Sequence, residues 1–191
     1  MATDAYVVGP CGEMWGRVGK MLLTGRYDRA LDDKLRLALP KPLRDVLATE
    51  KQLILTPGTD GSLSLFPGHA FAAFAEKLAS RSPTGQDVRA YSRLLYAQSQ
   101  TVEVDSQGRI RLSAELADLA HLADAVVLIG VGDRVELWNK SRWEAYLAKL
   151  QPRYDELAES ALGEVSPPSS RPAAATDSLS APPSELPRQP R

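Results

Sequence analysis

The middle of the chain repeats itself, and this duplication limits the folds that the sequence can adopt. Asp32–Arg36 recurs 73 residues later as Asp105–Arg109, and Leu53–Leu55 recurs at the same offset as Val126–Leu128. After a slightly shorter turn, the offset becomes 72. Because apolar and aromatic positions keep step over several elements, we predict two copies of one structural unit. The matches at the second offset are Leu63–Phe66 with Val135–Trp138, and Phe71, Phe74 and Leu78 with Trp143, Tyr146 and Leu150.

Each copy reads as strand, tight loop, strand, short helix, hairpin and helix, which predicts an α+β fold. In the second copy, residues 101–104 and 110–112 alternate between apolar and polar, as half-buried strands do. Residues 125–131 form an apolar run typical of a buried strand, and Gly132-Asp133 predicts the turn to its partner strand, 134–138. We expect a capping box of Ser141 and Glu144 to start the next helix. The aromatic residues of the hairpins and helices are expected in the core and at subunit interfaces: Phe66, Phe71, Phe74, Trp138, Trp143 and Tyr146.

The repeat and the composition together suggest where the parts of the chain begin and end. Residues 165–191 hold seven of the 14 prolines, six serines and no aromatic residue, a composition typical of disordered segments. We expect a disordered tail there, which could serve as a spacer or a docking segment. The other expected parts are a flexible arm (1–20), a first half (21–84), a connecting helix (85–100), a second half (101–150) and a helix (151–164) from Pro152 to Gly163.

Composition excludes several classes of protein. The net charge of −1 gives no global attraction to nucleic acid, so any such binding must come from a local patch. The single cysteine, Cys11, excludes an intramolecular disulfide and a multi-cysteine zinc site. No apolar run approaches the roughly 18 residues that span a bilayer, and residues 1–20 lack the apolar stretch of a secretion signal. We therefore expect a cytoplasmic protein that has no membrane partner.

The repeated loop, Asp-x-x-x-Arg between two strands, is the best candidate for a functional site. An aspartate at a turn accepts backbone N–H bonds, and a glycine before the arginine permits positive φ. The arginine can then present its planar fork to phosphate oxygens or to a guanine edge. The alternative is that each aspartate and arginine only pair to stabilise a hairpin. The candidate DNA-binding residues are Asp32, Lys34, Arg36, Asp105, Gly108 and Arg109.

An enzymatic function finds little support in the sequence. His69 and His121 are the only histidines, and His121 is expected on a short helix. Neither belongs to a nucleophile–base pattern, and no glycine-rich phosphate loop or metal-ligand spacing appears. We therefore expect no catalytic residue, no cofactor, no metal and no small-molecule substrate.

Residues 21 to about 150 resemble the MraZ family, within the wider AbrB-like swapped-hairpin group. The resemblance implies two tandem AbrB-like swapped-hairpin halves related by a pseudo-two-fold axis. It also implies a ring-shaped homo-oligomer whose loops contact short direct repeats in promoter DNA. Such a nucleoid-associated regulator would repress the division and cell-wall gene cluster. The matching segments are Gly25–Tyr27, Leu31–Pro40, Asp105–Ile110, Val131–Trp138 and Arg142–Trp143.

The chain departs from the family pattern at several places. Leu35 stands where the family has glycine, so the first loop must either adopt another turn or store strain. This departure favours the rival interpretation, in which the same fold serves as an oligomeric scaffold with weakened DNA binding. Ser113-Ala114 replaces the usual proline, and serine is expected to cap the helix instead. Residues 1–20 precede the usual start of family members, as an added arm or through an over-long gene assignment.

Overall fold

The structure is a computed structural model that describes residues 22–47, 50, 52–81 and 85–163. The arm expected over residues 1–20 and the tail expected over 165–191 lie outside these residues. The chain divides at Pro152 into two compact units. The first unit holds every described strand and five helices: α1 (Lys41–Leu47), α2 (Gly68–Ala79), α3 (Gln86–Gln98), α4 (Ala114–Leu119) and α5 (Lys140–Leu150). A 3₁₀ turn, η1 (Gln151–Arg153), precedes α6 (Tyr154–Leu162) in the second unit.

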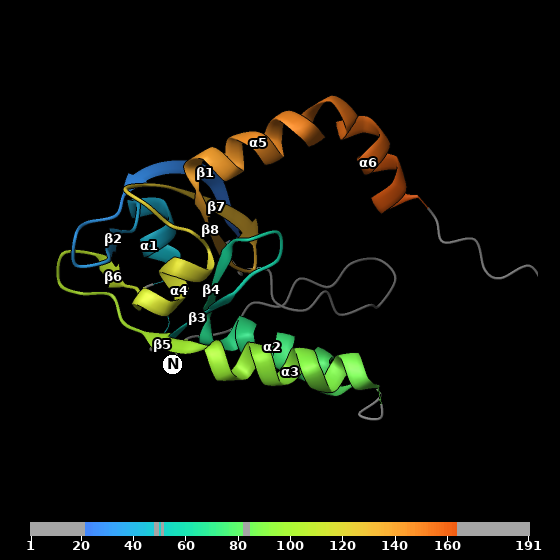
Figure 1. Cartoon of the computed structure of the whole chain (residues 1–191), viewed down its shortest axis with the longest axis horizontal. Helices are drawn as coiled ribbons and strands as arrows, with labels where there is room; N and C mark the ends of the chain where they lie inside the picture. Colours follow the sequence, from blue (N-terminus) through green and yellow to red (C-terminus); the bar gives the residue numbers. More distant parts are fainter. Residues whose placement is uncertain (1–21, 48–49, 51, 82–84, 164–191) are drawn as a thin grey trace, which may run out of the picture. The chain divides into compact units, whose positions relative to one another are not determined.

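The strands of the first unit form two antiparallel sheets, and the smaller sheet lies at one end of the unit (Figure 1). The smaller sheet is a two-stranded ribbon of β2 (Arg36–Ala38) and β6 (Arg109–Arg111). The larger sheet has six strands in the order β1 (Leu23–Ala30), β7 (Ala125–Gly132), β8 (Val135–Asn139), β4 (Leu63–Pro67), β3 (Leu53–Pro57) and β5 (Gln100–Val102).

Strands of one half pair with strands of the other half, which is consistent with the expected swapped hairpins. The first strand of each half pairs with the hairpin of the other half, β1 with β7 and β5 with β3. On the axis between the halves, residues pair with their own repeat counterparts. Leu37 lies opposite Ile110 in the ribbon, and Ser64 lies opposite Glu136 in the large sheet. The strand register therefore has the pseudo-two-fold symmetry of the sequence repeat, which confirms two tandem halves in an α+β fold.

One hydrophobic core joins the halves. Leu37 and Ile110 are fully buried, and they belong to a cluster that draws leucines and valines from both copies. The aromatic residues form two equivalent groups, centred on the buried side chains of Phe66 and Trp138. The ring centroids of Phe66 and Phe74 are 5.7 Å apart, and those of Trp138 and Tyr146 are 5.0 Å apart. Aromatic packing thus closes each hairpin onto the helix that follows it.

The helix ends confirm one prediction and correct two. Ser113 caps α4, because its hydroxyl accepts from the Leu116 N–H at 3.3 Å. The predicted capping box of Ser141 is wrong, because β8 runs directly into α5 and Asn139 is the N-cap. His121 is not on a helix either. It follows the end of α4 with a φ of 50°, the left-handed conformation that often ends helices.

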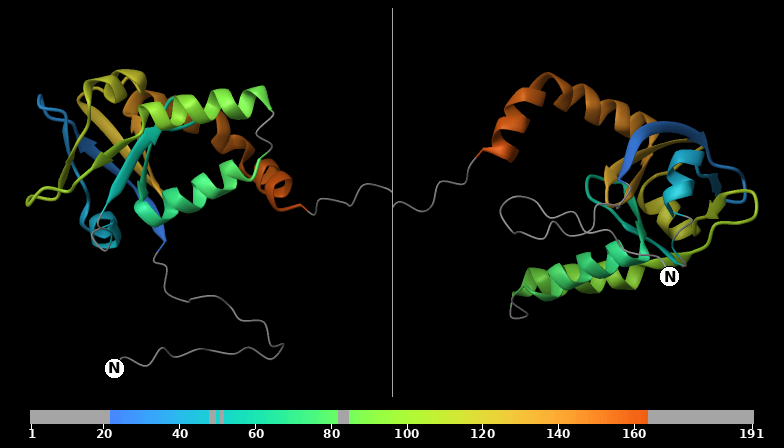
Figure 2. Two further views of the ribbon diagram at one scale, coloured as in Figure 1. Left: turned by 90° about the horizontal axis from the view of Figure 1, so that it is seen from below. Right: turned by 180° about the vertical axis from the view of Figure 1, so that it is seen from behind.

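Helices α2 and α3 lie side by side and antiparallel (Figure 2). The apolar side of α3 is only partly covered, because Leu95 is buried whereas Leu94 is 62% exposed. Among the described residues, no helix is both long enough and apolar enough to cross a membrane.

Candidate nucleic-acid interface

Asp32 fixes the shape of the loop between β1 and β2. Its Oδ1 accepts hydrogen bonds from the backbone N–H groups of Lys34 and Arg36, at 3.0 and 2.9 Å. Its carbonyl accepts from the Leu35 N–H at 2.8 Å, and its own N–H donates to the Arg36 carbonyl at 3.1 Å. An aspartate that accepts backbone N–H bonds in this way stabilises the turn of its own loop.

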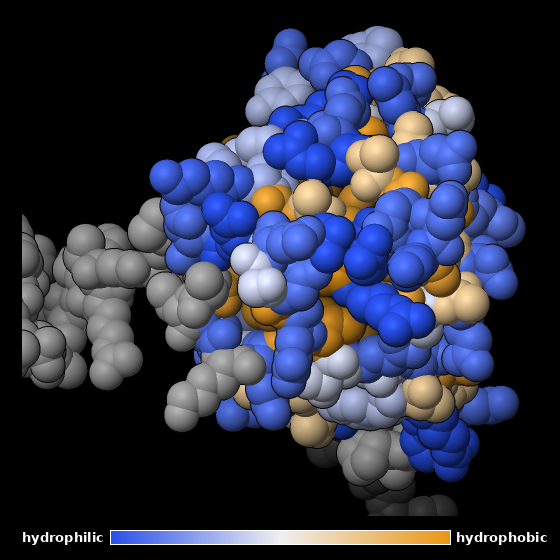
Figure 3. Space-filling model, turned by 90° about the vertical axis from the view of Figure 1, so that its left-hand side faces the viewer, coloured by the Kyte–Doolittle hydropathy of each residue, from blue (hydrophilic) through white to orange (hydrophobic). Residues whose placement is uncertain are grey.

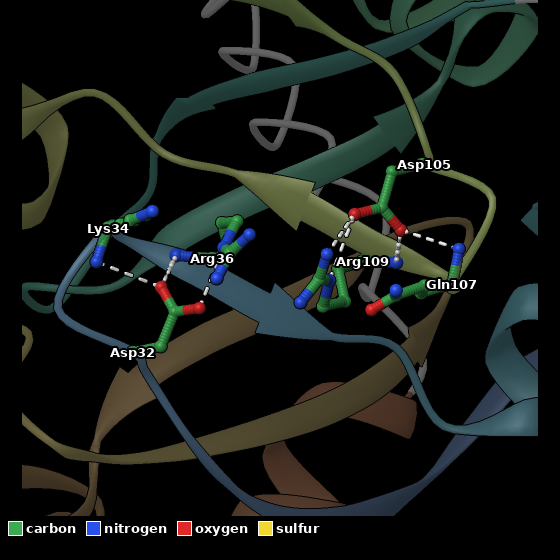
Figure 4. Close-up of polar contacts among 6 residues, drawn as sticks. All are labelled: Asp32, Lys34, Arg36, Asp105, Gln107 and Arg109. Carbon is green, nitrogen blue, oxygen red and sulfur yellow. Dashed lines mark hydrogen bonds and ion pairs between the residues drawn. The ribbon is translucent and has the colours of Figure 1, made fainter.

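Asp105 builds the second loop, between β5 and β6, with the same bonds (Figure 4). Its Oδ1 accepts from the N–H groups of Gln107 and Arg109, at 2.8 and 2.9 Å. Its carbonyl accepts from the Gly108 N–H at 2.8 Å, and its N–H donates to the Arg109 carbonyl at 2.8 Å. The two loops are therefore structural copies, although their sequences share only the aspartate and the arginine.

Each aspartate also orients the arginine of its loop. Arg36 Nε donates to Asp32 Oδ2 at 2.7 Å, and Arg109 Nε donates to Asp105 Oδ2 at 2.9 Å. The pairing that was expected as the alternative to a binding role is thus present. It does not use up the guanidinium groups. Asp32 contacts Arg36 through Nε, and Asp105 contacts Arg109 through Nε and Nη2, so further terminal N–H groups of each arginine remain. Partly exposed ion pairs of this kind add little stability, so their main effect is to fix the direction of the arginine.

Of the two outcomes predicted for the first loop, another turn or a strained backbone at Leu35, the structure has the strained backbone. The φ of Leu35 is 55°, close to the 76° of the equivalent Gly108, so the first loop keeps the turn of the second and carries the strain. A left-handed conformation costs a side-chain-bearing residue about 1–2 kcal/mol. Part of this is offset because the Leu35 side chain packs against the hydrophobic core. The missing glycine therefore leaves the loop geometry unchanged.

The loop bonds lower the pKa of both aspartates. The backbone N–H of Arg36 is the largest cause for Asp32, and the backbone N–H of Arg109 is the largest cause for Asp105. Hydrogen bonds from the arginine side chains act in the same direction, and partial desolvation opposes them. Hydrogen bonds to a carboxylate favour its charged form. Both aspartates therefore remain ionised, and keep hold of their arginines, at neutral pH.

The β2–β6 ribbon brings the two loops together on one side of the molecule. Leu37 and Ile110 point into the core and are fully buried. Because side chains alternate along a strand, Arg36 and Arg109 point to the opposite, outward side. Figure 4 shows the two arginines over neighbouring strands of the ribbon. The face of the molecule at this end is largely hydrophilic, with hydrophobic patches between the polar side chains (Figure 3).

The remaining candidate residues have different surroundings. Lys34 is exposed at the tip of the first loop. Gly108 is buried, and the end of the Arg44 side chain from α1 occupies the space that a Cβ there would need. Gly108 therefore allows the turn and the close approach of Arg44, and it offers no side chain to a ligand.

Sequence reasoning missed Arg111, which lies on the outward side of the ribbon. β6 places Arg111 opposite Arg36, and Ala38 opposite Arg109. The signal was present, because Arg109, Ile110 and Arg111 alternate in the manner of a half-buried strand. In the described part of the chain, no group of three or more His, Cys, Asp or Glu side chains is arranged to hold a metal ion. His69 instead contacts Glu50 through Nδ1 at 2.6 Å.

Comparison with known proteins also finds two copies of one unit, with the boundary between the copies within α3. The MraZ family model, described as "MraZ protein, putative antitoxin-like", matches residues 22–94 and again residues 95–163. The curated protein named Transcriptional regulator MraZ of Heliobacterium modesticaldum is 39% identical over 138 residues, which are 72% of this chain and 95% of that protein. The protein of the same name from Nocardia farcinica is 39% identical over 144 residues, 75% of this chain and 99% of that protein.

A third relative gives the same result. The Transcriptional regulator MraZ of Mycoplasmoides gallisepticum is 38% identical over 139 residues, which are 73% of this chain and 96% of that protein. Each relative is thus matched over nearly its whole length, and the family model falls twice onto the two halves that share one strand register. On these grounds the chain belongs to the MraZ family.

Proposed function

We propose that this chain is a DNA-binding transcription regulator whose two Asp-x-x-x-Arg loops contact promoter DNA. The observation that carries the proposal is the shared outward direction of Arg36 and Arg109, each held by an aspartate of its own loop. A guanidinium fixed in this way loses little rotamer entropy when it binds, and its planar fork fits phosphate oxygens or the O6 and N7 atoms of guanine. The curated relatives named transcriptional regulators support a regulatory role.

A single ribbon offers few contacts, so we propose that several copies act together. The affinity of a protein for DNA grows with the number of phosphates that it neutralises, and linked copies add avidity. A homo-oligomeric ring would present many loops to short direct repeats in a promoter. On this proposal, the protein works in the cytoplasm on the nucleoid and represses the division and cell-wall gene cluster.

The test is binding to the DNA upstream of the protein's own coding sequence. Wild-type protein should protect short direct repeats there, and its affinity should fall steeply between 50 and 200 mM salt, on the order of 10³-fold or more for an oligomer with many phosphate contacts. Arg36→Ala and Arg109→Ala should each cost about 1–3 kcal/mol of binding free energy. Arg93→Ala is the matched control, because Arg93 is exposed on α3, outside the ribbon.

The second candidate is an oligomeric scaffold of the same fold with weakened DNA binding. It is favoured by one observation, that the carboxylates of Asp32 and Asp105 already pair with the two arginines. If the double variant Arg36→Ala/Arg109→Ala bound DNA as well as wild type while sedimentation still gave a homo-oligomer, the scaffold would be the better interpretation.

A further inference from the structure

Arg111 adds a third arginine to the candidate interface, beside Arg36 and Arg109. It is exposed at the end of β6, directly opposite Arg36. The Leu112 N–H donates to the Leu35 carbonyl, and the Leu39 N–H donates to the Gly108 carbonyl, both at 2.9 Å. These bonds flank the ribbon, so Arg36 and Arg111 form a non-hydrogen-bonded pair, the type in which opposite side chains approach most closely.

The guanidinium of Arg111 has no acidic partner among the residues that the structure describes. In this it differs from Arg36 and Arg109, each of which contacts the aspartate of its own loop. Like charges directly opposite each other on antiparallel strands destabilise the pair. A pair of arginines in this position gains most when an anion lies between the two guanidinium groups.

The pair of Arg36 and Arg111 makes the two loops chemically different. Under the pseudo-two-fold symmetry, the counterpart of Arg111 is Ala38, which lies opposite Arg109. The counterpart of Lys34 is Gln107. The first loop therefore gathers three cations, those of Lys34, Arg36 and Arg111, against the carboxylates of Asp32 and Asp33. The second loop itself carries one arginine, held by its aspartate, and one uncharged amide, and the side chain of Arg44 from α1 lies against its Gly108.

We propose that Arg111 and Arg36 together bind a phosphate of the DNA backbone, so that the first loop holds the backbone while the second reads base edges. This inference rests on the proposed function. Two adjacent guanidinium groups supply several charge-assisted donors to one phosphate, and contacts of that kind position a protein without reading sequence. Gln107 and Arg109 are the side-chain types that pair with adenine and guanine edges in the major groove.

The experiment measures binding of the full chain to two DNA fragments of equal length, one with the upstream repeats and one with a scrambled sequence, over a series of salt concentrations. Arg111→Ala should weaken binding to both fragments by the same factor and should make the salt dependence shallower by about one unit of slope for each bound subunit. Arg111→Lys should recover most of the affinity, because a phosphate accepts a point charge. Arg93→Ala, on α3, is the control and should match wild type.

Arg109→Ala should act differently, by lowering affinity for the repeats while leaving the scrambled fragment nearly unchanged. If Arg111→Ala bound both fragments like wild type while Arg36→Ala lost affinity, the role of Arg111 would be wrong and the proposed function would stand. A loss by Arg111→Ala confined to the repeats would also overturn the inference, since it would mean base reading. If wild type itself bound neither fragment in a salt-dependent way, both proposals would fail.

Discussion

Leu35 and Gly108 occupy equivalent places in the two loops, and each is tied to the opposite half by its carbonyl. The Leu35 carbonyl accepts from the Leu112 N–H, and the Gly108 carbonyl accepts from the Leu39 N–H, both at 2.9 Å. These bonds hold the two backbones in the same left-handed conformation, although only one residue is a glycine. The neighbours of the two residues differ. Arg44 of α1 covers Gly108, whereas the residue equivalent to Arg44 in the other half is Ala117.

Gly108→Ala should therefore destabilise the protein for two separable reasons. A Cβ at a φ of 76° costs about 1–2 kcal/mol, and the new methyl group must also displace the side chain of Arg44. We expect a lower free energy of unfolding in urea denaturation at pH 7. The double variant Gly108→Ala/Arg44→Ala should lose less than the sum of the single variants, because the displaced neighbour is then gone.

Gly132→Ala is the matched control for the backbone contribution. Gly132 has a φ of 92°, and nothing lies within 4 Å of the place where its Cβ would be. This substitution should cost only the left-handed conformation, about 1–2 kcal/mol. If the two alanine variants were equally stable, the contact between Arg44 and position 108 would have no energetic role.

Leu37 and Ile110 should be the most costly positions of the ribbon to truncate. Both are fully buried and lie opposite each other on the pseudo-two-fold axis. Leu37→Ala and Ile110→Ala should each lower the free energy of unfolding by about 2–5 kcal/mol, from lost burial and from the cavity left behind. Leu22→Ala, at a position that is 68% exposed, should change it by less than about 0.5 kcal/mol. Similar losses at all three positions would contradict the place of the ribbon in the core.

Much of this fold follows from the repeat in the sequence. The strand register follows the same repeat that relates Asp32 to Asp105, since Leu37 lies opposite its own counterpart, Ile110. Hydrophobic alternation predicted the direction of the side chains in the ribbon. Asn139 was missed as the cap of α5, because a strand that runs into a helix leaves no loop to mark the start.

The sequence patterns could not predict contacts between residues that are far apart in the sequence. Arg36 lies opposite Arg111 only because β2 pairs with β6. Arg44 covers Gly108 only because of the way in which α1 packs. The conformation of Leu35 was left open for the same reason. Local propensity disfavours positive φ for leucine, and the hydrogen bonds of the ribbon override that preference.

The stability of the loops should depend on pH in the acid range. The pKa of Asp32 and that of Asp105 are both lowered below the ordinary 3.8. A carboxyl group whose pKa is lower in the folded state stabilises the protein at pH values above its pKa in the unfolded state. This contribution is lost as the pH falls through the pKa of the folded state. The urea midpoint should therefore fall on going from pH 5 to pH 3, partly because these two carboxylates become protonated.

Asn substitutions separate this effect from the titration of other groups. Asp32→Asn/Asp105→Asn keeps an oxygen that can accept the backbone N–H bonds, but it removes the titrating charge. The double variant should start from a lower urea midpoint at pH 7 and lose less of it between pH 5 and pH 3 than wild type. Parallel curves for the two proteins would show that the loop carboxylates do not contribute to acid sensitivity.

If Asp105 positions Arg109, a substitution of Asp105 should change the affinity for DNA in the direction opposite to the one expected from charge alone. Removing a carboxylate near DNA should strengthen any contact that depends on charge alone. If Asp105 positions the guanidinium, Asp105→Asn should instead lower the affinity for the upstream repeats by roughly tenfold, toward the loss expected for removing a base-contacting side chain. Asp33→Asn is the control, because Asp33 is exposed in the first loop and makes no ion pair within the described residues. It should bind as well as wild type or better. Tighter binding of the repeats by Asp105→Asn would mean that the ion pair restrains Arg109 without directing it to the DNA.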